Sequence, residues 1–419
     1  MPDFPTRRYE QFMNKIFLFF FNKIKASNFQ KQMERFKEVD YFNVLVIAAG
    51  IILAILIRYS LLGYKSPDYI GKVSHWYNFI KSNGFSAFAT NFSTYSPPYL
   101  YLLYLLIRIN PGISSLIGVK IPGLICDFVC SYYVYRIVKI KSASSMLPSL
   151  AALAVLFAPT VILNSAYWGQ DDSIYTAAIA ACIYFLIARK NWLSMFAYGI
   201  ALSFKLQAIF LAPVLFALFL RKILNWKELL LIPFVLLLSL VPSWIAGRPI
   251  SDLLNVYLNQ SSQFETITMN APTIYTWVPQ TKEVFNLLYV PGILLGGVMA
   301  FLLVVVIYKS QAELTPSTIL ELSLVSFMLI PFFLPKMHER YFFPADVISI
   351  AFAFYFPQFF FIPIMMSAVS FLSYEPYLFE QTPVPFPMLT LGLFIAVCIL
   401  VRNVITNLYT SETNRAAIE

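Results

Sequence analysis

The sequence predicts an all-α polytopic membrane protein, a helical bundle of about twelve transmembrane helices with external juxtamembrane helices. Of the 419 residues, 59% are hydrophobic and only 12% are charged, whereas soluble domains carry roughly 25% charged residues. Apolar stretches follow one another along nearly the whole chain after about residue 42. Because backbone polar groups must be satisfied internally in lipid, we expect these stretches to be helices of one bundle, without an appended soluble domain.

Residues 1–41 form a basic segment before the first long apolar stretch. The positive-inside rule assigns such a density of lysine and arginine to the cytoplasm. Phe12, Ile16, Phe19 and Phe20 recur among the basic residues at helical spacing, which predicts an amphipathic helix in the membrane surface. The formal net charge of +9 comes largely from this segment, and it suits anionic membrane lipids rather than nucleic acid.

The transmembrane domain is expected at 42–404 and a cytoplasmic tail at 405–419. The first span, about 44–62, delivers a first external loop at 63–112. Within this loop the stretch Pro97–Ile109 is shorter than the roughly 20 residues that a span needs, and prolines open it, so we expect a short helix on the outer side. The distribution of basic residues then places a long external loop at 248–283 and both termini in the cytoplasm.

In this topology the polar residues at the ends of the apolar stretches all fall on the non-cytoplasmic side. Ionisable residues are costly beside lipid and usually face a bundle interior or a water-filled cavity, so we expect one external, partly desolvated polar chamber. Short apolar helices flank Lys205, which indicates that this residue is recessed in the cavity. The residues concerned are Asp68, Asp171, Asp172, Lys205, Gln207, Arg248, Lys336, His338, Glu339 and Arg340.

Each carboxylate also has a simpler explanation. Asp68 follows a proline in KSPDY, as aspartates of turns and helix caps do. Asp171 and Asp172 could make a structural salt bridge to Lys205 or Arg340. They could also hold a divalent cation, but neighbouring side chains on a helix diverge by about 100°. A metal is therefore not favoured, no cofactor is expected to be required, and Asp171 and Asp172 are its ligands if one binds.

The segment KMHERY, residues 336–341, gathers potential cations beside an apolar helix that cannot solvate them. Lys336 or Arg340 alone is equally explained by a long side chain that reaches the lipid headgroups. His338 lacks the spaced His or Cys partners of a zinc site. Together these residues suit a phosphate held beside lipid. This predicts a lipid phosphate that carries a sugar.

Several motifs occur in a fixed order: an Asp in the first external loop, YSPPYLYLL, NSAYWGQDDSI, KLQAIFLAPVL, AGRP and PKMHERYFFPADV. In this order they resemble the bacterial integral-membrane mannosyltransferase-like proteins related to the second mannosyltransferase of glycosylphosphatidylinositol synthesis, which are GT-C glycosyltransferases. The resemblance runs from about Arg58 to Asp346. It implies a GT-C-type bundle that moves a sugar from a polyprenyl-phosphate-sugar donor to a hydroxyl of a glycan or glycolipid acceptor. The resemblance does not fix the sugar, and we expect mannose.

In GT-C enzymes an acidic residue of the first external loop is the base, and Asp68 is the only carboxylate between the first span and YSPP. A sugar hydroxyl must lose its proton as it attacks, so a carboxylate within about 3 Å is needed. A phosphate departs as an anion, so cations suffice on that side, and a single displacement inverts the anomeric centre. We expect Asp68 to be catalytic and the donor phosphate to lie against Lys205, Lys336, His338, Arg340 and Tyr341.

The remaining candidates would orient these groups or hold sugars. Trp168 offers a ring face for sugar stacking, although aromatic belts also place tryptophan at membrane interfaces. The predicted orienting and sugar-binding residues are Trp168, Gln170, Asp171, Asp172, Gln207 and Glu339. Residues of the long external loop could close the chamber over an acceptor, and these are Arg248, Asn270, Tyr275 and Trp277.

Two other functions are compatible with such a bundle. A lipid-linked sugar flippase or another multi-span transporter also has about twelve spans and buried charges at helix breaks, and a lipid-binding scaffold would need no chemistry. Against a transporter, the polar groups gather on one side, and we find no convincing internal repeat. The sequence makes no prediction of the oligomeric state.

Overall fold

The computed structural model describes residues 41–256 and 265–416. The predicted amphipathic helix at 1–40 and the last residues of the predicted tail lie outside the described residues. The chain divides into Met1–Gly50 and a compact unit, Ile51–Glu419. All candidate site residues belong to the second unit.

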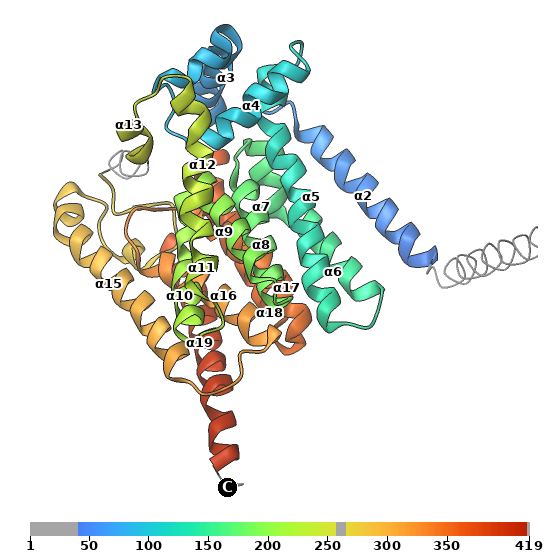
Figure 1. Cartoon of the computed structure of the whole chain (residues 1–419), viewed down its shortest axis with the longest axis vertical. Coiled ribbons are helices and arrows are strands. Elements are labelled where there is room, and N and C mark those ends of the chain that lie inside the picture. Colours follow the sequence, from blue (N-terminus) through green and yellow to red (C-terminus); the bar gives the residue numbers. More distant parts are fainter. Residues whose placement is uncertain (1–40, 257–264, 417–419) are drawn as a thin grey trace, which may run out of the picture. The chain divides into compact units, whose positions relative to one another are not determined.

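Helices separated by short turns make up nearly all of the described chain (Figure 1). The label η marks short 3-10 or π segments. In the N-terminal half the elements are α2 (Tyr41–Leu61), η1 (Tyr69–Val73), α3 (Ser74–Asn83), η2 (Gly84–Ala89), α4 (Pro97–Ile109), α5 (Ser115–Lys141), α6 (Met146–Phe157), α7 (Pro159–Ile162), η3 (Leu163–Trp168), α8 (Asp172–Ile187) and α9 (Asn191–Phe204).

The C-terminal half continues in the same manner. Its elements are η4 (Leu206–Leu211), α10 (Ala212–Leu220), α11 (Trp226–Leu229), α12 (Leu231–Ile245), α13 (Ile250–Leu254), β1 (Thr268–Met269), η5 (Ile274–Trp277), α15 (Lys282–Lys309), α16 (Pro316–Phe333), β2 (Met337–His338), η6 (Glu339–Phe342), α17 (Phe343–Tyr355), η7 (Pro357–Phe359), α18 (Phe361–Leu378) and α19 (Phe386–Ala416).

The predicted all-α polytopic fold is confirmed. Among the described residues, 7 helices are long and apolar enough to cross a membrane, or up to 8 if the bent pair Met146–Phe157 and Pro159–Trp168 is one span. Shorter apolar helices at Pro97–Ile109, Asp172–Ile187 and Leu206–Leu220 accompany them. The bent pair turns by 51° because Pro159 has no N–H for the helical ladder. The short helix predicted at Pro97–Ile109 has those bounds.

The core of the unit lies around α8 and α16. Helix α8 packs against α5, α9, α16 and α17, and 78% of the apolar window of α16 is buried. A helix that is hydrophobic all round is typical of such a buried position. The outer helices α12 and α15 bury far less of their length.

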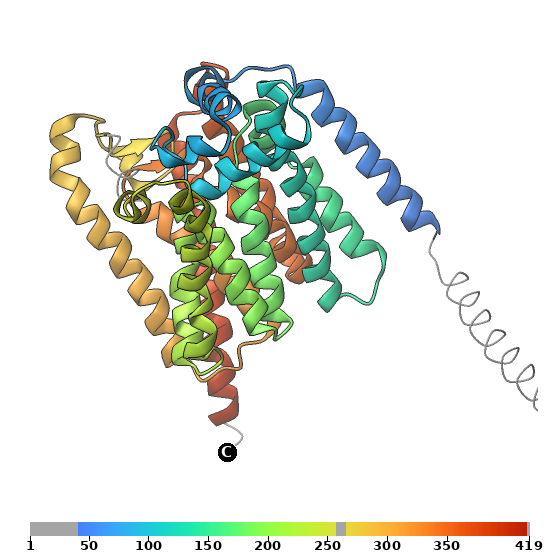
Figure 2. The ribbon, with the colours of Figure 1, turned by 45° about the horizontal axis from the view of Figure 1, so that its top comes forward.

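The loop at 248–283, which was predicted to be external, is tied to the KMHERY segment by a small parallel ladder. Strand β1 pairs with β2, with Thr268 opposite Met337 and Met269 opposite His338. The Lys336 N–H also donates to the Ile267 carbonyl over 2.7 Å. Figure 2 shows the two strands beside the end of the unit that carries α3 and α4. The ladder thus holds together two segments that are far apart in the sequence.

Candidate functional site

One large cavity, here called the chamber, lies where several helices end. Its volume is about 720 Å³. Its walls come from η1, the turn before α4, the turn before α8, η4, and the connection between α16 and α17. The sequence-predicted residues that line it are Asp68, Asp171, Lys205, Gln207, Asn270, Lys336, His338, Glu339, Arg340 and Tyr341.

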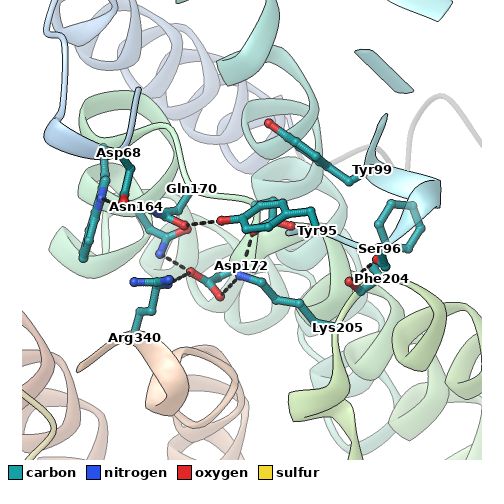
Figure 3. Close-up of polar contacts among 12 residues, drawn as sticks. Asp68, Tyr95, Ser96, Tyr99, Asn164, Gln170, Asp172, Phe204, Lys205 and Arg340 are labelled. Carbon is teal, nitrogen blue, oxygen red and sulfur yellow. Dashed lines mark hydrogen bonds and ion pairs between the residues drawn. The ribbon is translucent and has the colours of Figure 1, made fainter. Parts of the chain in front are cut away.

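The Asp68 carboxylate is held by two donors of the WGQDDS segment (Figure 3). Trp168 Nε1 donates to Asp68 Oδ2 over 2.8 Å, and Gln170 Nε2 donates to the same oxygen over 2.6 Å. Asp68 precedes η1 but makes no capping hydrogen bond with its side chain. The helix-cap explanation is therefore wrong. A carboxylate has about four acceptor sites, so the two donors leave capacity to accept a further proton.

A tyrosine extends this hydrogen-bond chain. Tyr95 Oη donates to Gln170 Oε1 over 3.0 Å, which fixes the amide so that its nitrogen faces Asp68. Burial, and next the Asp171 carboxylate, raise the pKa of Tyr95 well above its ordinary value. The hydroxyl therefore stays protonated and remains a donor.

Buried groups brace the chain just before Asp68. Ser66 Oγ donates to the Trp168 carbonyl over 2.6 Å. Lys120, which is 1% exposed, donates to the carbonyls of Leu61, Leu62 and Tyr64 over 3.3, 3.1 and 2.9 Å. Buried polar groups of this kind are costly unless bonded. They hold the α2–η1 connection, and with it Asp68, against the bundle.

Lys205 forms ion pairs with both of the neighbouring carboxylates, Asp171 and Asp172. Its Nζ lies 2.6 Å from Asp171 Oδ1 and 2.6 Å from Asp172 Oδ1. Burial alone would lower the pKa of Lys205, but the two carboxylates outweigh it and raise this pKa. The lysine side chain is 11% exposed and lines the chamber. The structure thus contains the salt bridge that the sequence left open.

Arg340 adds a second cation to this cluster. Its Nε lies 3.7 Å from Asp172 Oδ2, and its Nη1 lies 3.1 Å from Glu339 Oε1. The guanidinium carbon sits 5.5 Å from the ring centroid of Trp168, the residue that donates to Asp68. Asn164 Nδ2 donates to Asp172 Oδ2 over 2.8 Å. Trp168 therefore contacts both the candidate base and a candidate phosphate ligand.

His338 borders the chamber beside Arg340. Its Nδ1 lies 3.8 Å from Glu339 Oε2. Burial lowers the pKa of His338 below its ordinary value, and the positive charge of Arg340 lowers it further, while Glu339 opposes this only in part. The imidazole is therefore mostly neutral at pH 7 and can gain a proton when an anion binds nearby.

Trp168 is not the sugar-stacking or interfacial residue that the sequence suggested. Its side chain is 1% exposed. The ring stacks on Tyr377 at 5.0 Å between centroids and meets Arg340 as described. Because its ring is covered, sugar stacking does not fit, and the orientation of Asp68 stays the prediction for this residue.

The loop at 248–283 contributes less to the chamber than expected. Asn270 lines it and bridges to His338. Arg248 instead donates to Asn91 Oδ1 over 2.7 Å, and Tyr275 is buried with its hydroxyl on the Phe333 carbonyl, 2.8 Å away. Trp277 is 51% exposed. The last three do not line the chamber, which corrects the expectation that they meet an acceptor there.

Sequence reasoning missed three residues. Tyr95 stands in the YSPPYLYLL motif, Tyr377 lines the chamber from α18, and Lys120 braces the connection to Asp68. A lysine within the apolar stretch 115–141 was the available signal for the third, because a buried cation needs partners. The YSPPYLYLL motif was the available signal for Tyr95, whereas no local pattern distinguishes Tyr377 among the 26 tyrosines of the chain.

The structure shows no obvious metal centre. Within the residues that it describes, no group of three or more His, Cys, Asp and Glu side chains is placed to hold a metal ion. Lys205 occupies the position between Asp171 and Asp172 where such an ion would bind. Metal independence remains a prediction.

Comparison with known proteins identifies solved structures of similar fold. ArnT from Cupriavidus metallidurans bound to undecaprenyl phosphate matches with a TM-score of 0.54 and 14% identity, over 88% of this chain and 74% of that chain. The apo state of the same protein matches with a TM-score of 0.53 and 14% identity, over 87% and 74%. No protein-family model matches the sequence, and no curated protein does either.

At this identity the likeness concerns the fold. It confirms the predicted polytopic helical bundle, whose fold is similar to that of ArnT. Together with the apolar helices, it identifies the chain as a multi-pass integral membrane protein.

Proposed function

We propose that this protein is an inverting glycosyltransferase that moves a sugar from a polyprenyl-phosphate-sugar donor to a hydroxyl of a glycan or glycolipid, on the non-cytoplasmic side of the membrane. One observation carries the proposal: the Asp68 carboxylate and the cations Lys205, Lys336 and Arg340 line the same cavity. The fold that this chain shares with ArnT, a protein solved with undecaprenyl phosphate bound, supports the same donor class.

The chemistry follows from the charges around the chamber. The acceptor oxygen attacks the anomeric carbon while its proton passes to Asp68, and the bond from that carbon to the phosphate oxygen breaks with its electron pair on the phosphate. Lys205, Lys336 and Arg340 stabilise the charge that the phosphate gains. No general acid is needed, because the leaving group departs as an anion. Attack opposite the phosphate inverts the anomeric centre.

Mannose is the sugar that we propose, because the motifs resemble mannosyltransferase-like proteins. The chamber volume of about 720 Å³ accommodates a hexose and a phosphate, with the prenyl tail between helices. Asp171 and Asp172 would keep Lys205 charged and aimed at this phosphate.

The test combines the purified full chain with synthetic undecaprenyl phosphate mannose, its glucose counterpart and a native membrane extract. We expect release of undecaprenyl phosphate and a labelled product of the opposite anomeric configuration. Asp68→Asn should lower the rate about 10²–10⁴-fold with donor affinity retained. Asp252→Asn, at an exposed position of α13 outside the chamber, is the matched control and should be fully active.

A flippase would behave differently. It would carry the donor across proteoliposome membranes with the sugar–phosphate bond intact, and Asp68→Asn would change only affinity. Translocation without cleavage of that bond would overturn the proposal.

A further inference from the structure

The last turn of α18 reaches the part of the chamber wall that holds Asp68. Tyr377 lies in this turn, is half-buried, and lines the chamber together with Asp68. Its ring stacks on that of Trp168, with 5.0 Å between the centroids and 27° between the planes. Trp168 in turn donates its Nε1–H to Asp68 Oδ2. Tyr377 therefore packs on the indole that binds the candidate base.

A second contact ties the end of α18 to the connection that carries Asp68. Tyr64, between α2 and η1, donates its hydroxyl to the Leu378 carbonyl over 3.2 Å, although the two residues are 314 positions apart. The last carbonyls of a helix have no partner within the helix, so they can accept such a bond. The Tyr64 ring also stacks on Tyr167, with the centroids 3.6 Å apart. The last turn of α18 and the chain before Asp68 are thereby held together.

The hydroxyl of Tyr377 also contacts Asp68 itself, through a side-chain hydrogen bond to the carboxylate. A phenol is protonated at pH 7, so the hydroxyl donates and the carboxylate accepts. The other two donors, Trp168 and Gln170, are 1% and 3% exposed, and neither is among the described residues that line the chamber. Of these three donors to Asp68, Tyr377 is the one that faces the space where a substrate would bind.

We propose that Tyr377 is a positioning residue of the transfer reaction, whose hydroxyl holds the Asp68 carboxylate from the open side of the chamber and directs its remaining acceptor site at the attacking hydroxyl. A carboxylate has about four acceptor sites, so three donors leave one for the proton that the attacking hydroxyl gives up. Tyr377 keeps its own proton and makes no bond to the sugar. The inference rests on the proposed function and adds a residue beyond the motifs, which end at about Asp346.

Tyr374 provides a matched control on the same helix. It precedes Tyr377 by about one turn, and its ring also contacts Trp168, with 5.4 Å between the centroids. Its hydroxyl, however, has no hydrogen-bond partner within the described part of the chain, and Tyr374 is not one of the described residues that line the chamber. Tyr374→Phe and Tyr377→Phe therefore remove the same hydroxyl from two rings that pack on one indole. Only the second variant removes a donor to Asp68.

The first measurement is the rate of transfer from synthetic undecaprenyl phosphate mannose to native membrane extract by the purified full chain. We expect Tyr377→Phe to lower kcat about tenfold, the effect of one hydrogen bond to a charged group, with the KM for the donor unchanged. Tyr374→Phe should change neither constant. In the Asp68→Asn background, Tyr377→Phe should not lower the residual rate further, because residues that act through one group are not additive. A defect of packing alone would lower both rates.

The second measurement tests the contact without catalysis, by thermal unfolding of the full chain in detergent. The Tm shift of the double variant Asp68→Asn, Tyr377→Phe should differ from the sum of the two single shifts, because residues of one hydrogen-bond network are coupled. The double variant Asp68→Asn, Tyr374→Phe should show additive shifts.

Unchanged kcat in Tyr377→Phe, a further loss in the Asp68→Asn background, or additive Tm shifts for Asp68 and Tyr377 would each overturn the inference. If the unaltered chain transfers no sugar, the proposed function fails instead, and the Tm measurement still decides whether Tyr377 holds Asp68.

Discussion

Two buried ion-pair clusters of the helical unit have opposite relations to the chamber. Arg58 Nε lies 2.9 Å from Asp127 Oδ2, with the side chains 4% and 0% exposed, and neither residue lines the chamber. Lys205 and Arg340 pair with Asp171 and Asp172 and border it. The first cluster is enclosed by protein, and the second opens toward a ligand.

Their hydrogen bonds differ in the same way. Asp127 also accepts from Ser165, directly before the AYWGQDDS segment, and from Ser173 at its end. Arg58 Nη1 donates to the Leu156 carbonyl over 3.0 Å. Asp127 thus fixes both ends of the segment whose side chains bind Asp68 and Lys205. A closed cluster positions the chain, whereas an open one can exchange partners with substrate.

Breaking the closed cluster should have the largest effect on stability. Arg58→Leu leaves the Asp127 carboxylate buried without its cation, and we expect a loss of about 3–5 kcal/mol in the free energy of unfolding. The double variant Arg58→Leu, Asp127→Leu should recover much of this loss, because it removes both charges. Thermal unfolding in detergent measures both. Equal destabilisation by the single and double variants would contradict this account.

Breaking the open cluster should instead affect ligand binding. Lys205→Met leaves two carboxylates facing the donor phosphate, so we expect affinity for undecaprenyl phosphate to fall about tenfold to hundredfold. Lys282→Met removes an exposed lysine that pairs with exposed Glu265, and it should leave affinity unchanged. Unaltered binding by Lys205→Met would show that this cluster is structural as well.

Trp168→Phe separates orientation from packing. The substitution deletes the Nε1–H that Asp68 accepts but keeps a ring between Tyr377 and Arg340. We expect kcat to fall about tenfold, the effect of one charge-assisted hydrogen bond, with donor affinity unchanged. A change in affinity without a change in kcat would instead assign Trp168 to the sugar.

The smallest effect concerns pH. His338 has a lowered pKa in the free protein, and a bound phosphate raises this pKa, so binding is accompanied by proton uptake. Donor affinity should therefore increase a few-fold from pH 7.5 to pH 5.5. A phosphodiester donor such as undecaprenyl phosphate mannose keeps its own charge constant over this range. His338→Gln should flatten the dependence, and an unchanged slope would assign it to another group.

Some of the site could be predicted because it depends on local sequence. The lengths of the apolar stretches determine that the chain spans a membrane many times, since lipid permits only internally bonded backbones there. Lys336, His338 and Arg340 are neighbours in sequence, so any fold places these three side chains near one another. Asp68 could be singled out because no other carboxylate precedes the YSPP motif in the first external loop.

Only the tertiary structure decided what each side chain meets. Trp168 donates to Asp68 across about a hundred residues of sequence. Arg248 pairs with Asn91 instead of reaching the chamber. Tyr377 lines the chamber from α18, near the C-terminal end of the described chain. Such partners depend on how helices pack, and packing is set by the shapes of many side chains at once. Hydropathy and motifs therefore determined the membrane fold and the charges available to it, while helix packing decided which carboxylate faces which cation.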